Sequence, residues 1–145
     1  MKHNLILKVV SKFLIPLIFL FALYVQFHGD FGPGGGFQAG VIFSAAIILY
    51  TLVFGVDDAK KVITPTILRL LASLGVLIYA GTGVATLLLG GNYLEYGVLA
   101  STQVAGQHLG ILVIELGVGI TVMAVMLIMF FAFAERGRPN EEGND

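Results

Sequence analysis

The sequence predicts an all-α integral membrane protein with four transmembrane helices and with both chain termini in the cytoplasm. Hydrophobic residues make up 57% of the 145 residues, charged residues only 12%, and the apolar residues gather in long runs. A soluble domain carries roughly a quarter charged residues. A chain this apolar and this short therefore needs lipid as the solvent for most of its side chains.

Four apolar runs are each long enough to cross a bilayer, which requires about 20 residues. They cover approximately residues 5–27, 37–55, 67–89 and 109–133, and they form one membrane domain over residues 1–134. Residues 135–145 are polar and are expected to be a cytoplasmic tail.

The first run also shares features with a secretory signal peptide, because a basic segment precedes its apolar part. A cleaved signal ends in small residues, whereas the bulky residues Tyr24, Gln26 and Phe27 follow Ala22. We therefore expect a retained helix, with Pro16 as a residue that can bend it.

The basic residues predict the orientation. All eight lie at the start of the first run or before it, around the connection between the second and third runs, or after the fourth run: Lys2, Lys8, Lys12, Lys60, Lys61, Arg69, Arg136 and Arg138. The connections over residues 28–38 and 90–108 contain no Lys or Arg. The positive-inside rule therefore assigns both termini to the cytoplasm. In the basic connection, Thr64 before Pro65 is typical of a cap followed by the first turn of a helix.

A glycine-rich segment separates the first two runs and reads Gly29-Asp30-Phe31-Gly32-Pro33-Gly34-Gly35-Gly36. The stretch 34–39 also fits G-x-G-x-x-A, but a dinucleotide-binding fingerprint requires a preceding strand and a βαβ unit. Glycines and a proline instead allow a tight turn against a neighbouring surface. Two interpretations stay open: a compact reversal, or a segment that docks against another subunit or lines an ion path.

Small residues recur at four-residue spacing in the predicted helices, a pattern that allows close helix packing. They are Gly36, Gly40 and Ser44 in the second helix, and Gly106, Gly110, Gly117 and Thr121 in or before the fourth. A polar stripe in the third helix consists of Gly75, Tyr79, Thr82 and Thr86, and we favour a packing seam over a transport path for it.

Glu115 is the strongest candidate for chemistry, because it lies inside the apolar run of the fourth helix. An ionisable residue there is costly and marks a functional site by default. The alternative is a carboxyl group that holds helices together. His108 shares its helical face, while His28 and Asp30 border the first connection, and all three join Glu115 as ion-pathway or gating candidates.

Several function classes are disfavoured. A net charge of −1 offers no basic face for nucleic acid. The chain has no Cys, and we find no nucleophile–base pair, metal-ligand cluster or cofactor motif, so no enzyme activity, cofactor or metal is expected. Lone histidines far apart in sequence are more often interface residues than metal ligands.

The segment from Phe27 to Gly40 resembles a family signature. With Pro33, Gly34, Gly35, Gly36, Phe37, Gln38 and Gly40 it is similar to the P-G-G-G-F segment of the B subunit of Mrp-type (Mnh-type) multisubunit sodium/proton antiporters. The similarity extends over nearly the whole chain, although many family members have a histidine where this chain has Asp30.

The resemblance implies a multi-pass subunit in the cell membrane that contributes to assembly and to the sodium route. Its partners would be other membrane subunits, especially the large A subunit, and Na+ and H+ would be the ions that the complex transports. A structural subunit of a related membrane-bound hydrogenase is the alternative. A stand-alone small multidrug exporter is disfavoured, because such exporters carry a glutamate in their first helix and this chain has none there.

Overall fold

The computed structural model describes residues 2–29 and 34–136, with side chains from residue 5 onward within those ranges. In chain order the elements are α1 (Lys2–His28), α2 (Gly36–Phe54), α3 (Val56–Val62), α4 (Pro65–Leu88), the 3₁₀ helix η1 (Tyr96–Leu99) and α5 (Gln103–Arg136). The four helices α1, α2, α4 and α5 are long and apolar enough to cross a membrane. The prediction of an all-α chain with four spans is therefore confirmed.

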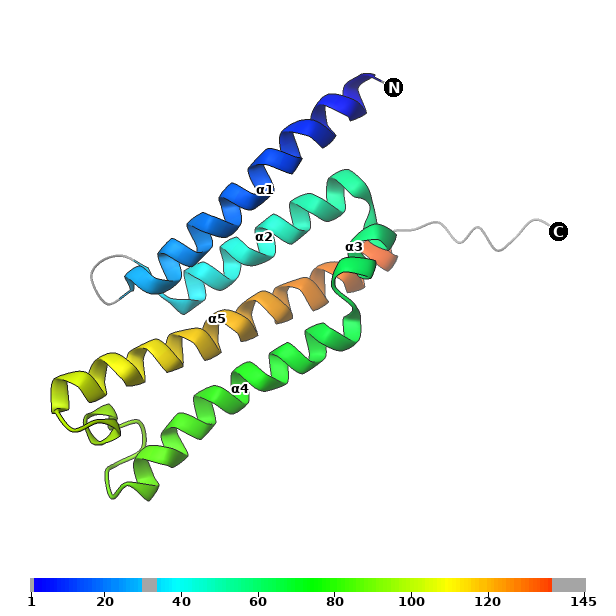
Figure 1. The fold of residues 1–145 in the computed structure, drawn as a ribbon. Coiled ribbons are helices and arrows are strands. Elements are labelled where there is room, and N and C mark those ends of the chain that lie inside the picture. Colours follow the sequence, from blue (N-terminus) through cyan, green and yellow to red (C-terminus); the bar gives the residue numbers. More distant parts are fainter. Residues whose placement is uncertain (1, 30–33, 137–145) are drawn as a thin grey trace.

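The four long helices lie side by side in the order α1, α2, α5, α4 (Figure 1). The principal helix contacts join α1 to α2, α2 to α5, and α5 to α4. In the most apolar stretch of each helix, only 11% to 28% of the residues are buried inside the chain. Both faces of this row are therefore open, and lipid or other proteins must cover them.

The two described ends of the chain lie at the same end of the row as α3 (Figure 1). The junction between α1 and α2 and the connection that contains η1 lie at the opposite end (Figure 1). A buried cluster stabilises the α3 end and consists of Ala59, Leu68, Ala124, Leu127 and Phe131. This arrangement matches four crossings that begin and end on one side.

The fourth spanning helix begins earlier than expected, at Gln103 instead of residue 109. Thr102 opens it, since its side-chain oxygen accepts from Ala105 N at 3.3 Å and its carbonyl accepts from Gly106 N at 3.0 Å. The prediction followed the apolar run, whereas the cap lies in the polar residues before that run. With 34 residues, α5 is about 50 Å long and extends beyond a bilayer core of about 30 Å.

The basic connection contains the short helix α3, which the sequence analysis did not predict. Its first turn carries Asp57 and Asp58 and its last turn Lys60 and Lys61, which is the arrangement that the helix dipole favours. Lys61 donates to Asp58 at 2.8 Å, and this hydrogen bond raises the pKa of the lysine above its usual value.

The end of α5 and the start of α4 both lie next to α3. The sequence predicts that Glu135 lies in the tail, whereas the structure places it in the last turn of α5. There Glu135 pairs with Lys60. Thr64 caps α4 as predicted: its hydroxyl oxygen accepts from Ile67 N at 3.3 Å, and Pro65 is the first residue of the helix. α1 continues through Pro16 to His28.

Candidate functional site

Glu115 lies on α5 at the level where α1 ends and α2 begins, and its side chain is half-buried. A Cβ atom added to Gly29 would lie 2.5 Å from Glu115 Oε1 and 2.7 Å from Oε2. A Cβ added to Gly35 would lie 3.1 Å from Oε1. The carboxylate therefore lies against the glycines at positions 29 and 35, and we call Glu115 with Gly29, Gly34, Gly35 and Gly36 the Glu115 junction.

Gly34 and Gly35 lie against the last turns of α1. Gly35 N donates to Val25 O at 3.2 Å, and a Cβ on Gly34 would lie 2.8 Å from the same oxygen. Gly35 has a φ of 126°, which side chains rarely adopt, and its carbonyl accepts from Ala39 N at 3.0 Å to open α2. The described glycines of this segment thus contact the end of α1, and Gly29 and Gly35 also face Glu115.

The Glu115 junction places a carboxylate beside the first residues of α2. Gly35 precedes the helix and supplies no side-chain cap of its own. The amino end of a helix carries partial positive charge from its free N–H groups. A negative charge on Glu115 therefore complements the start of α2, although it comes from another helix.

The seam between α2 and α5 depends on small residues of α2. A Cβ on Gly36 would collide with the backbone oxygen of Glu115, and one on Gly40 would lie 2.6 Å from Gly119 O. Ser44 is fully buried; its hydroxyl donates to Val41 O at 2.7 Å and lies 3.6 Å from Met126 Sδ. The small residues of the second helix thus form a close contact with α5 within this chain.

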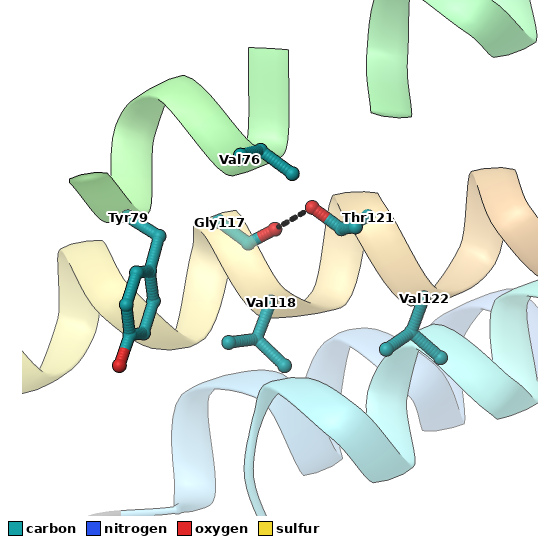
Figure 2. A pocket seen from close by; sticks show the side chains of 6 residues that line it. All are labelled: Val76, Tyr79, Gly117, Val118, Thr121 and Val122. Atoms are coloured by element: carbon teal, nitrogen blue, oxygen red, sulfur yellow. Dashed lines mark hydrogen bonds between the residues drawn. The ribbon is translucent and has the colours of Figure 1, made fainter. Parts of the chain in front are cut away.

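The seam between α4 and α5 is built similarly. A Cβ on Gly75 would lie 2.6 Å from Gly117 O and would collide with the hydroxyl of Thr121. Beside this contact is an apolar cavity of about 210 Å³ with side chains from both helices (Figure 2). The Thr121 hydroxyl donates to Gly117 O at 2.8 Å within its own helix. This part of the polar stripe is therefore a packing seam, the interpretation that the sequence favoured.

The connection after α4 is held by Thr86, which is fully buried. Its hydroxyl donates to Gly83 O at 2.8 Å and accepts from Leu94 N at 2.9 Å. Tyr93 packs on Gly83, and Tyr96 packs on Gly110 at the start of α5. Burial raises the pKa of the Tyr96 phenol, so that phenol is neutral at physiological pH.

Comparison with known proteins identifies the family of this chain. Residues 6–128 match the family described as a domain related to the MnhB subunit of the Na+/H+ antiporter. The chain belongs to the MnhB family. Relatives named putative antiporter subunit mnhB2, from Staphylococcus aureus strains Newman, JH1 and COL, are 34% identical over 134 residues, which cover 85% of this chain and 94% of theirs.

Membership of the MnhB family and four helices that can span a membrane together assign a general role. The chain is a multi-pass cell-membrane protein and a membrane subunit of a multisubunit Na+/H+ antiporter. The matched range includes the whole Glu115 junction. The candidate site therefore lies inside the MnhB domain and not in an appended segment.

Two other residues predicted for the site, His28 and His108, lie in described helices. His28 stacks on Tyr24 in the last turn of α1, with ring centroids 4.9 Å apart. His108 is exposed and lies in α5, not in the preceding connection. In the described ranges, no three His, Cys, Asp or Glu side chains gather in a way that could hold a metal ion.

The structure describes some of the predicted motif residues of this MnhB-family chain and not others. Asp30 and Pro33 lie outside the described residues. Phe37 is 61% exposed in the first turn of α2, beside a groove that α5 lines with Thr121, Val125 and Met129. Gln38 is exposed, and its Oε1 lies 3.3 Å from the position of a Cβ on Gly35.

Sequence reasoning missed Gln26 as a site residue. Its side chain is buried where α1 meets α5, and a Cβ on Gly119 would lie 2.6 Å from its Oε1. The available signal was an amide inside an otherwise apolar membrane helix. That signal is weak, because an amide carries no charge and because Gln26 lies near the end of α1.

Proposed function

We propose that this chain acts in the antiporter as an assembly and gating subunit, and that the Glu115 junction contributes to the sodium route. Its partners are the other membrane subunits, the large A subunit foremost, and Na+ and H+ are the ions of the whole complex. The chain itself is not an enzyme and does not transport alone.

The contact between Glu115 and the glycine backbone is the observation that carries this proposal. A half-buried carboxylate in a membrane helix attracts cations, and here it also complements the amino end of α2. A cation that approaches Glu115 competes with α2 for the same negative charge. Cation arrival therefore loosens the junction, and its departure tightens it, which is the property that a gate requires.

The open row of helices supports dependence on partners. Each spanning helix contacts its neighbours in the row, and most of its surface faces outward. A path for ions through a membrane must be enclosed by protein, since lipid-exposed charge is costly. Other subunits would supply the missing walls against the two faces of the row.

We also propose that the α3 end faces the cytoplasm. The described basic residues of this end include Lys60 and Lys61 in α3 and Arg136 at the end of α5. The Glu115 junction and the η1 connection then face the outside. In this orientation the junction meets ions that have left the cell or are about to leave it.

Purification through a tag on this chain tests the proposal. Mild detergent should retain the other antiporter subunits, and their identification also separates the antiporter from a hydrogenase-type complex. The complex and the isolated chain are then compared in liposomes for sodium-driven proton movement. Activity in the complex and none in the chain alone is expected, whereas robust antiport by the isolated chain rejects the proposal.

A further inference from the structure

Gln26 is a buried amide in a membrane helix with an unused hydrogen-bond donor. The residue is 5% exposed, and its Nε2 atom is buried without a hydrogen-bond partner among the residues that the structure describes. Buried polar groups in proteins nearly always have a partner, since an unpaired donor is costly. The unpaired amide therefore points to a ligand that supplies an acceptor.

Gln26 lies next to the Glu115 junction. A Cβ on Gly119 would lie 2.6 Å from Gln26 Oε1 and 3.1 Å from Gly36 O, so α1, α2 and α5 meet at this point. Gly119 follows Glu115 by about one helical turn on α5. The amide thus lies one turn deeper along α5 than the carboxylate.

A cavity of about 250 Å³ adjoins Gln26 at this meeting of three helices. Its other walls are apolar and include Phe27 from α1, Phe43 from α2, and Leu116 and Met123 from α5. A water molecule takes about 30 Å³ of liquid volume, so the cavity has room for several. Apolar walls alone do not retain water, which needs polar partners.

We propose that Gln26 binds water in this cavity, with Nε2 donating to a water oxygen. The terminal torsion of a glutamine side chain is soft, so the amide can turn toward the cavity that its side chain already lines. The N–H group repels a bare cation and donates to an uncharged oxygen ligand such as water. The site therefore hydrates the space beside Glu115 and does not coordinate Na+ directly.

This inference goes beyond the proposed function, because hydration of the cavity does not require Glu115 to lie on the ion route. X-ray footprinting of the assembled complex in lipid nanodiscs measures it, since hydroxyl radicals formed from bound water oxidise adjacent side chains. Met123 lines the cavity, and Met129 lies on the other face of α5 in a separate groove. Met123 should be oxidised in the wild type.

Gln26→Met is the test variant, because methionine keeps the length of the side chain and removes the amide. We expect loss of Met123 oxidation and unchanged Met129 oxidation. Gln26→Leu gives the same readout if the first variant fails to assemble. Equal Met123 oxidation in wild type and variant overturns the inference, and so does an unoxidised Met123 in the wild type, the result expected if a partner helix supplied the acceptor. Antiport is not part of the readout, so failure of the proposed gating role leaves this result unaffected.

Discussion

The carboxylate of Glu115 occupies the space that a side chain at Gly29 would need. The two residues come from α5 and from the end of α1, and a Cβ on Gly29 would lie 2.5 Å from Oε1. A side chain at position 29 would therefore have to displace the carboxylate of an acid from another helix.

Gly29→Ala should destabilise the chain within the complex. Forcing a methyl group into a packed site costs about 1–3 kcal/mol. Gly81→Ala is the matched control, because a Cβ at Gly81 meets nothing within 4 Å and alanine is the better helix former. The yield and the thermal unfolding temperature of the purified complex measure the difference.

The double variant Gly29→Ala/Glu115→Ala assigns that cost to the carboxylate. Residues in direct contact give non-additive effects, so the double variant should lose less stability than the sum of the two single variants. Strict additivity would mean that alanine at position 29 is destabilising for another reason.

Glu115→Gln should assemble and should lower the antiport rate or shift its pH optimum. Glutamine keeps the shape of the side chain but cannot carry the charge that holds α2 and attracts cations. Antiport in inverted vesicles over a range of pH and sodium concentration measures the effect, with subunit levels checked by blotting. Glu135→Gln, at the other end of the same helix, is the control for a lost carboxylate, because it removes the ion pair with Lys60 and leaves the Glu115 junction unchanged. Wild-type rates at every pH would restrict Glu115 to holding helices together.

Asp30→Asn should behave differently from Glu115→Gln. We predict that Asp30 lies in a wet loop, where salt screens its charge over about 10 Å at 0.1 M ionic strength. The variant should therefore need more sodium for half-maximal antiport at low ionic strength, with little loss of maximal rate. An equal loss at low and high ionic strength would contradict a role in attracting cations.

Phe37→Ala should reduce complex yield or the activity per complex. Phe37 is 61% exposed beside a groove that α5 lines, so its ring is available to anchor another subunit. Leu52→Ala is the control from the far end of α2, with 71% exposure. We expect Pro33→Gly to impair the complex as well, because proline restricts the turn. Normal yield and activity for Phe37→Ala and Pro33→Gly would leave the segment as a connector only.

Thr86→Val should loosen the connection after α4. The change removes the acceptor for Leu94 N and leaves a half-buried donor without its partner, at a cost of about 1–3 kcal/mol. Leu94 has a φ of 62°, a conformation that costs a non-glycine residue about 1–2 kcal/mol, so Leu94→Gly should offset part of the loss. Hydrogen exchange of residues 89–102 checks both effects. Unchanged exchange in Thr86→Val would show that the hydroxyl does not hold the connection.

Much of the membrane architecture was predictable because its signals are local. Thr64 capped its helix as the dipeptide with Pro65 predicted. The start of α5 was misplaced because Thr102 caps it within a polar stretch, ahead of the apolar run on which the prediction relied. α3 was missed because an isolated helix of seven residues is unstable and depends on contacts such as Lys60 with Glu135.

The sequence by itself determined the membrane class, the four spans, the MnhB resemblance and Glu115 as the principal candidate. Hydrophobicity, charge and short motifs act over one helix or one loop, so a single chain segment reports them. Only the tertiary structure decided that Glu115 meets Gly29 and Gly35, and that Gln26 is buried beside Gly119 without a partner for Nε2 among the described residues. Those relationships depend on which helices are neighbours and how they are rotated. That choice is made by packing between distant segments, and no local pattern contains it.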